Sequence, residues 1–332
     1  MFNQTKKYTS LILCLGFGLI FSLIFNQFNH NLALAGSSQL IAQLPEVAEI
    51  PGTPTQVNLF QAIVLGFVQG ATEFIPISST AHLTAIPVFF GWGDPGVSFI
   101  AVIQLGSVAA VLSYFWSDLS QITRGMINAV RTSDYDSQDF WLAVGIAVGT
   151  IPIVILGLIL KIFEPEFYEN TLRSMPSIAI VSIVMALLLA LAESIGTQKR
   201  NFKDLTVKDG ILVGLAQALA IIPGVSRSGS TMTAGLFNNL DRATAARFSF
   251  LLGIPAILLS GLVELRELIS PAEGTSFEIL PLVGALISSA VFSYLAIAWL
   301  LEFLKRRSTW VFVWYRLAFG VFILVAVSQG WI

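Results

Sequence analysis

The chain has little charge, one cysteine and two histidines. Charged residues make up 11% of its 332 residues, which is less than half of the roughly one quarter found in soluble domains. Its 18 basic and 20 acidic residues form no clustered positive surface, which excludes a nucleic-acid partner. The single cysteine, Cys14, excludes a disulfide framework and a zinc site built from cysteines.

What the chain has in excess is apolar sequence. Hydrophobic residues make up 55% of it, and its mean hydropathy is +0.79. A helix needs about 20 apolar residues to cross a bilayer, and six segments meet that requirement. They are 97–116, 140–163, 176–195, 247–266, 280–301 and 310–330. The sequence therefore predicts an all-α, polytopic membrane protein.

The N-terminal region has the features of a signal peptide or of a retained N-terminal anchor. Lys6 and Lys7 precede an apolar run at 11–25, and small residues follow before residue 36. Both interpretations of 1–35 place the next residues outside the cell. Residues 36–56, which contain three prolines, are predicted to form a linker.

Two apolar segments are broken by proline and continue into polar residues. The first runs from Gly66-x-x-Gln69 to Pro76-x-x-Ser79, and the second from Gly214-x-x-Gln217 to Pro223-x-x-Ser226. Broken backbone within a bilayer is tolerated only where protein buries it or where it lines a wet cavity. We therefore predict that each copy forms a re-entrant helical hairpin.

Three predicted spans follow each copy, so the two copies enter the membrane from opposite faces. The integral membrane domain, 57–332, is thus predicted to be an inverted-topology repeat, about 57–195 and about 208–332. Each half holds one re-entrant hairpin and three transmembrane helices. The copies are 147 residues apart at their prolines and 148 apart at their first glycines, a slippage of one residue. Sites between such repeats lie near the bilayer midplane.

Basic residues lie in alternate loops and set the orientation. They are Arg124 and Arg131, then Lys199, Arg200, Lys203 and Lys208, then Lys305, Arg306 and Arg307. These loops are predicted to be cytoplasmic, which places the first hairpin on the outer side and the second on the inner side. Aromatic residues near span ends are interpreted as interfacial anchors. These are Trp299, Trp310, Trp314, Tyr315 and Trp331.

Glu73 lies in an apolar context, and ionisable residues within a membrane are functional candidates. The alternative is a structural ion pair with Arg227. Gln69 lies four residues before Glu73, which places both side chains on one helix face. Their oxygens suit a hard divalent cation, Mg2+ or Ca2+, especially where substrate phosphates complete the shell.

Arg227 lies among hydroxyl-bearing residues and a glycine, namely Ser226, Ser228, Gly229, Ser230 and Thr231. A guanidinium pairs bidentately with phosphate oxygens, and glycines let backbone N–H groups approach an anion. Phosphate is therefore the predicted ligand. The alternative is a turn whose serines cap the following helix, which does not explain an arginine within the membrane.

His82 follows Ser78, Ser79 and Thr80. From three residues away the imidazole can reach Ser79 as a general base or acid. The alternative is a histidine that is only a satisfied polar group. Ser78 and Ser79 are both candidates for the nucleophile and for a helix cap, and the sequence does not separate them.

The two motifs closely resemble those of the bacitracin-resistance type undecaprenyl-diphosphatases. The matching segments are 70–83 (Gly-Ala-Thr-Glu-Phe-Ile-Pro-Ile-Ser-Ser-Thr-Ala-His-Leu) and 223–231 (Pro-Gly-Val-Ser-Arg-Ser-Gly-Ser-Thr), and the similarity extends from about residue 59 to the C-terminus. The resemblance implies a plasma-membrane enzyme that hydrolyses undecaprenyl diphosphate to undecaprenyl phosphate and phosphate. Such an enzyme recycles the lipid carrier of peptidoglycan synthesis and confers bacitracin resistance. The resemblance also implies dependence on a divalent cation.

Carried over by position, the family's catalytic residues correspond to Glu73, Ser79, His82 and Arg227, and Gln69 joins Glu73 in the metal-binding motif. The phosphate-binding segment corresponds to Ser226, Arg227, Ser228 and Thr231, and Ser78, Thr80 and Gly229 are further candidates for binding phosphate. The sequence departs from the family at Gln69, where many members have Glu, and at Ala81, where Gly is usual.

These residues together suggest a mechanism in which Ser79 attacks the terminal phosphorus with help from His82, while Arg227, backbone N–H groups around Gly229 and the cation stabilise charge. A rival mechanism uses water activated by the metal or by His82, with Ser79 only binding phosphate. A competing class is a lipid-phosphate flippase or an ion-coupled secondary transporter, which also uses inverted repeats. The site is expected to face the extracytoplasmic side. The expected partners are the lipid substrate and the membrane, and the sequence allows a homodimer.

Overall fold

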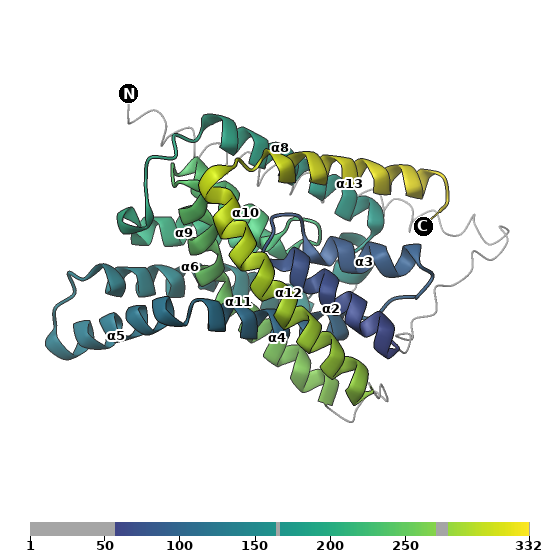
Figure 1. Ribbon diagram of the computed structural model, residues 1–332, viewed down its shortest axis with the longest axis horizontal. Coiled ribbons are helices and arrows are strands. Elements are labelled where there is room, and N and C mark those ends of the chain that lie inside the picture. The colour runs from purple at the N-terminus through teal and green to yellow at the C-terminus, as the bar shows by residue number, and fades with distance from the viewer. Residues whose placement is uncertain (1–56, 164–166, 270–277, 332) are drawn as a thin grey trace.

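A computed structural model of the protein describes residues 57–163, 167–269 and 278–331 (Figure 1). The predicted signal peptide or anchor (1–35) and the linker (36–56) lie outside the described residues. Within the described ranges the chain forms helices and one isolated β-bridge, between Arg200 and Leu240, and no strand. The prediction of an all-α protein is therefore confirmed.

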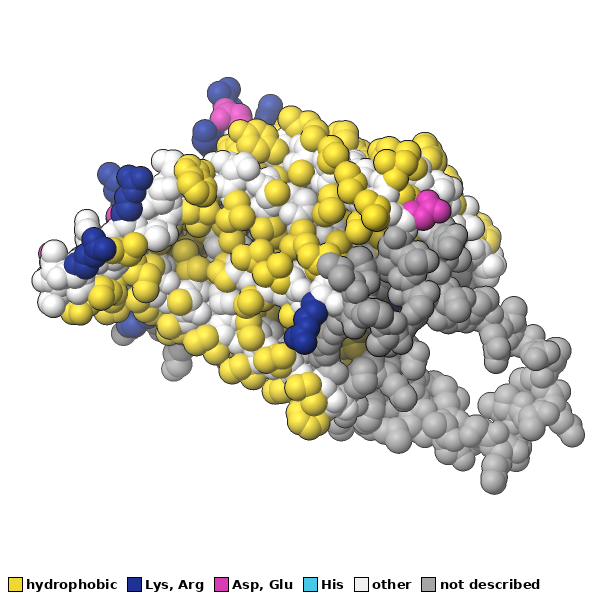
Figure 2. Space-filling view, turned by 90° about the horizontal axis from the view of Figure 1, so that it is seen from below, with side chains coloured by type: hydrophobic (Ala, Val, Ile, Leu, Met, Phe, Trp, Pro, Cys, Tyr) yellow, Lys and Arg dark blue, Asp and Glu magenta, His cyan; other side chains and the backbone are white. Residues whose placement is uncertain are grey.

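Six of the described helices are long and apolar enough to cross a membrane, and they correspond to the six predicted spans. They are α4 (Val97–Tyr114), α6 (Gln138–Phe163), α8 (Met175–Ile195), α11 (Arg242–Ile269), α12 (Ile279–Arg306) and α13 (Trp310–Ser328). Hydrophobic side chains are spread over the described surface that Figure 2 shows, as contact with lipid requires. The chain is a polytopic membrane protein.

Helix α5 (Trp116–Thr132) lies in the predicted loop after the first span and was missed. It is amphipathic, because Ile122 and Ala129 are buried while Arg124 and Arg131 are exposed. It packs beside the first turns of α6. A search for long apolar runs does not detect a helix of this composition.

Four shorter helices form the two broken segments: α2 (Leu59–Glu73), α3 (Ser79–Phe89), α9 (Val207–Ala218) and α10 (Arg227–Phe237). Pro76 lies between α2 and α3, and Pro223 lies between α9 and α10. Proline has no N–H and disfavours helical backbone in the residue before it, and α2 and α9 end shortly before these prolines, at Glu73 and Ala218. The longest of the four, α2, has 15 residues and spans about 22 Å, less than the roughly 30 Å hydrocarbon core.

The two halves of the chain exchange their packing partners. Helix α2 packs along α12 of the second half, and α9 packs along α6 of the first half. The spans α8 and α13 lie side by side, and α12 crosses the molecule diagonally in Figure 1. This reciprocal pairing supports the inverted repeat. The face from which each hairpin enters the membrane stays a prediction.

Gly66 and Gly214, which open the two motif copies, allow these helices to approach closely. A Cβ on Gly66 would overlap the backbone of Ala285 in α12, and a Cβ on Gly214 would overlap the backbone of Gly149 in α6. Small residues at such contacts are the usual means of close helix packing in membranes. In both halves, therefore, the repeated glycine is explained by the close packing of two helices.

We expect Gly214→Ala to lower the melting temperature of the detergent-solubilised protein by several degrees, because overpacking a close contact costs about 1–3 kcal/mol. The matched control is Gly157→Ala in α6, where a Cβ meets no atom within 4 Å. Alanine is favoured over glycine within a helix, so the control keeps or raises the melting temperature. Equal melting temperatures for both variants would contradict the close packing of α9 on α6.

The structure corrects the alignment of the two motif copies. Ser78 and Ser226 cap α3 and α10 with left-handed backbone, at φ 74° and 69°, and each side chain accepts a hydrogen bond from the backbone N–H three residues later. They are 148 residues apart, as are the first glycines. Ser226 therefore corresponds to Ser78, Arg227 corresponds to Ser79, and the slippage lies in the prolines alone.

Candidate active site

The carboxylate of Glu73 joins the two motif copies. Glu73 ends α2, and its side chain is only 6% exposed. Its Oε2 accepts hydrogen bonds from Ser79 Oγ at 2.7 Å and from Gln69 Nε2 at 3.0 Å. Its Oε1 pairs with Arg227 Nη2 at 3.2 Å. The structure thus brings four of the predicted site residues together at one buried carboxylate.

Arg227 reaches Glu73 from the first residue of α10. Its Nε and Nη1 atoms are buried and have no hydrogen-bond partner among the described residues. Nη1 occupies the space that a side chain on Gly253 of α11 would fill. Because leaving a buried donor unpaired is costly, these two free donors mark a place for an anionic ligand.

Helices α3 and α10 both present their N-termini to this carboxylate. They begin at Ser79 and Arg227, whose side chains both contact the Glu73 carboxylate. The first backbone N–H groups of a helix have no partner within it, and they carry partial positive charge. Two such ends at one point favour the binding of an anion.

The other predicted phosphate-binding residues mainly shape the two turns. Ser228 Oγ donates to the carbonyl oxygens of Glu73 and Ile75, at 3.3 and 3.2 Å. Thr231 Oγ1 donates to the Arg227 carbonyl at 2.7 Å. Ser226 caps α10 through the N–H of Gly229, as Ser78 caps α3, and Thr80 is half-buried in the first turn of α3.

Gln69 is anchored by a buried network of serines. Its Nε2 lies 3.4 Å from Ser107 Oγ of α4, and Ser107 in turn bonds Ser293 at 2.8 Å and Ser289 at 3.1 Å, both from α12. All four side chains are fully buried. The Oε1 atom of Gln69 has no hydrogen-bond partner among the described residues, so it is a free acceptor beside Glu73.

The residues present fit a divalent cation that arrives with a phosphorylated substrate. The described residues contain no group of three or more His, Cys, Asp or Glu that could hold a metal. The available oxygens are the Glu73 carboxylate and the free Oε1 of Gln69. Mg2+ is often bound by one or two protein oxygens, with water and substrate phosphates as its other ligands.

The hydrogen bonds of His82 lead away from Ser79. Its Nδ1 lies 2.7 Å from the Ser78 carbonyl oxygen, and its Nε2 lies 2.6 Å from the hydroxyl of Tyr315 in α13. Ser79 instead donates to Glu73. The pairing of Ser79 with His82 that the spacing suggested is therefore not formed. Tyr315, interpreted from the sequence as an interfacial anchor, is the partner of the histidine.

Arg316 is the main residue of the site that the sequence analysis missed. It is fully buried in α13, and it donates to the carbonyl oxygens of Pro76 (3.3 Å), Gly224 (2.7 Å) and Val225 (3.1 Å). One guanidinium therefore holds the turns that precede α3 and α10. The signal was present in the sequence, since an arginine within an apolar span meets the criterion that selected Glu73.

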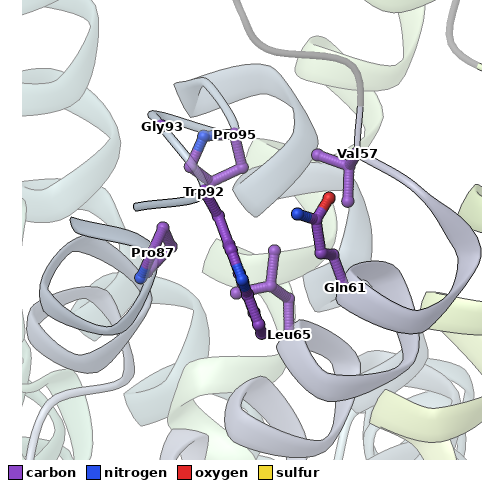
Figure 3. A pocket seen from close by; sticks show the side chains of 7 residues that line it. All are labelled: Val57, Gln61, Leu65, Pro87, Trp92, Gly93 and Pro95. Atoms are coloured by element: carbon purple, nitrogen blue, oxygen red, sulfur yellow. The ribbon is translucent and has the colours of Figure 1, made fainter. Parts of the chain in front are cut away.

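The hollow in Figure 3 lies at the opposite end of α2 from Glu73. It is lined by Val57, Gln61, Leu65, Pro87, Trp92, Gly93 and Pro95. Most of these side chains are apolar, and none of them is a predicted site residue. The hollow is therefore not part of the candidate active site.

Together, the fold and the site define a polytopic membrane protein with a buried Glu–Ser–Arg centre, placed between two helix N-termini and suited to phosphoryl groups. Residues 62–322 match the family model described as "Bacitracin resistance protein BacA". The chain belongs to this family.

Curated relatives cover most of the chain. It is 64% identical over 274 residues to the undecaprenyl-diphosphatase of Synechocystis sp., an overlap of 82% of this chain and 84% of the relative. It is 60% identical over 281 residues to the undecaprenyl-diphosphatase of Nostoc sp., which covers 84% and 87% of the two chains. The protein of the same name from Trichormus variabilis is 59% identical over 283 residues, 85% and 88% of the two chains.

Proposed function

We propose that this chain removes the terminal phosphate of undecaprenyl diphosphate, the activity that the names of its relatives give to those proteins. The reaction returns undecaprenyl phosphate to peptidoglycan synthesis and confers bacitracin resistance. One observation supports this assignment most strongly. Arg227 keeps two buried donors free for an anion beside a serine hydroxyl that already donates to a carboxylate.

In the proposed reaction, Nε and Nη1 of Arg227, whose N–H groups lie on different edges of the guanidinium, bind separate oxygens of the diphosphate. Ser79 Oγ attacks the terminal phosphorus while its proton passes to Glu73 Oε2, the atom 2.7 Å away. The bond from this phosphorus to the bridging oxygen breaks, and undecaprenyl phosphate leaves with the proton. Free N–H groups at the starts of α3 and α10 stabilise the charge that develops on the phosphoryl oxygens.

The second step restores the enzyme. Water attacks the phosphoserine and gives its proton to Glu73, which passes it to Ser79 Oγ as the phosphorus–serine bond breaks. Inorganic phosphate is then released. In this proposal Glu73 rather than His82 is the base, which is supported by the hydrogen bond that Ser79 donates to its carboxylate.

We also propose that Glu73 and Gln69 hold a divalent cation, Mg2+ or Ca2+. When bound, such a cation neutralises charge on the diphosphate. The buried Oε1 of Gln69 is the atom that supports this proposal, since it has no hydrogen-bond partner among the described residues. The serine network keeps Oε1 free by holding the amide nitrogen of Gln69.

We place the protein in the plasma membrane, with the site open to the extracytoplasmic side. The Lys and Arg side chains visible in Figure 2 lie mostly toward one end of the molecule, which supports a cytoplasmic location for that end. The apolar tail of the substrate stays in the bilayer, so its head enters between helices. A homodimer stays a prediction.

Phosphate release by the purified full chain tests this function. We expect undecaprenyl diphosphate to yield phosphate in a reaction that chelators stop, and Ser79→Ala to lower kcat by about 10³-fold or more, as loss of a nucleophile does. Ser113→Ala, at an exposed serine of α4, is the matched control and keeps full activity. Protein quenched during turnover carries phosphoserine at position 79.

Two outcomes would revise the proposal. Strong residual activity in Ser79→Ala assigns the attack to water and leaves Ser79 as a phosphate-binding residue. Binding and transbilayer movement of the lipid without phosphate release by the wild-type chain favours the flippase.

A further inference from the structure

The proposed reaction assigns no role to His82 and Tyr315, although the two side chains are hydrogen-bonded beside the site. We propose that His82 is a positioning residue, which holds the turn before α3 through a neutral imidazole whose proton is on Nδ1. Tyr315 fixes this form of the ring by donating to Nε2. The proposal rests on the proposed function, because it concerns how Ser79 is held for attack.

The bonding partners of the ring determine which nitrogen carries the proton. The Ser78 carbonyl oxygen can only accept, so Nδ1, 2.7 Å away, carries the hydrogen. A neutral imidazole has one N–H, so Nε2 accepts from the Tyr315 hydroxyl at 2.6 Å. Neither nitrogen is then free to take a proton from Ser79. The fully buried guanidinium of Arg316, the next residue of α13, opposes a second positive charge on the ring.

Comparison with α10 shows which backbone hydrogen bond is weak in α3 and is supplemented by the imidazole. In α10, the carbonyl of the capping residue Ser226 accepts the backbone N–H of Ser230 at 2.8 Å. In α3, the equivalent bond from the His82 N–H to the Ser78 carbonyl is 3.4 Å long. The imidazole supplies a bond of 2.7 Å to that same oxygen. It therefore supports a serine at φ 74°, a conformation that a residue with a side chain holds only when its surroundings enforce it.

This turn sets the position of the nucleophile. Ser79 follows Ser78 directly and begins α3, so a change in the turn moves both its hydroxyl and the free N–H groups of the helix. The imidazole is itself fixed, because it is 5% exposed and lies parallel to Phe319, with ring centroids 4.4 Å apart. Loss of the support should therefore lower kcat more than it changes substrate binding.

Replacing the two ring nitrogens separately tests the proposal. His82→Asn keeps an N–H near the position of Nδ1, whereas His82→Gln keeps one near Nε2. We expect His82→Asn to stay within about tenfold of wild-type kcat, and His82→Gln and His82→Leu to lose about 100-fold, as misplaced catalytic groups do. Equal, large losses in the Asn and Gln variants would show that the Nδ1 bond does not carry the function of His82 and would overturn the proposal.

Removing only the tyrosine hydroxyl tests the second half of the proposal. Tyr315→Phe keeps the ring that stacks on His82 and is expected to lower kcat about three- to tenfold at unchanged KM. The effect is smaller than that of losing the imidazole, because Ser79 is displaced less. Tyr294→Phe in α12, whose ring packs on Tyr114, is the matched control. Equal kcat in the two variants would remove Tyr315 from the proposal.

The tautomer itself can be observed without an activity assay. The chain has two histidines, so His30→Gln leaves His82 as the only one, and 15N-histidine NMR then reports a single ring. We expect the neutral form with the proton on Nδ1 in the full chain at neutral pH, and a mixture of tautomers in Tyr315→Phe. An Nε2–H ring or an imidazolium would overturn the proposal. The spectrum needs no substrate, so its outcome is independent of whether the lipid is hydrolysed.

Discussion

Glu73→Gln is expected to lower kcat for phosphate release by about 10³-fold, within the range for loss of a positioned base. The amide keeps the size of the carboxylate but cannot take the proton of Ser79. The substitution also removes the negative charge that pairs with Arg227. The freed guanidinium then attracts the diphosphate more strongly, so KM measured at saturating cation stays the same or falls. Steady-state kinetics in detergent, with kcat and KM measured separately, checks both parts.

Glu302→Gln is the matched control for this prediction. Glu302 lies near the end of α12, where it pairs with Lys305 and Arg306 and is 54% exposed. Exposed pairs of this kind contribute little, so the control should behave as wild type. Near-normal kcat in Glu73→Gln would contradict the role of Glu73 as base, and a raised KM at unchanged kcat would assign it to binding.

Arg227→Lys is expected to lower kcat/KM by about 10²- to 10³-fold, the usual effect of losing donors that stabilise transition-state charge. The substitution keeps the positive charge but loses the planar fork. The three donors of an ammonium share one nitrogen, so while one of them pairs with Glu73 the others cannot reach the separate positions of Nε and Nη1. Inhibition by inorganic pyrophosphate should weaken in parallel, which a competition assay measures.

Arg247→Lys provides the control for the arginine substitution. Arg247 pairs with Asp118, and its side chain is 38% exposed, so it lies outside the candidate site. This variant should keep wild-type kcat/KM and pyrophosphate inhibition. If Arg227→Lys also kept both, the guanidinium fork would not be the phosphate-binding group.

The membrane spans follow from the sequence because each one is a long apolar run, and length alone identifies such runs. Helix α5 cannot be predicted in this way, because its segment is polar and only one side of it is buried by packing on α6. The sequence alignment of the two motif copies was wrong by one residue at the serines, because it was anchored on the prolines. Proline is the conspicuous residue in each copy, but the left-handed caps Ser78 and Ser226 define the turns, and sequence letters do not show a backbone angle.

Within the site, Glu73 and Arg227 can be identified from the sequence, because a charged residue in an apolar segment is costly. Contacts between distant elements cannot be read from the sequence. The bond from His82 to Tyr315 joins residues 233 positions apart, and spacing along one helix suggested Ser79 instead. Arg316 was detectable by its type, yet its function of joining the two turns depends on packing that only the structure shows.

The central claim is that the two motif copies bind one diphosphate together. The most direct measurement is an experimental structure of the Ser79→Ala variant with undecaprenyl diphosphate bound. We expect the terminal phosphorus to lie between position 79 and Arg227, with diphosphate oxygens on the free donors of Arg227 and near the first N–H groups of α3 and α10. A diphosphate held by one motif copy alone, or bound away from Glu73 and Arg227, would contradict the claim.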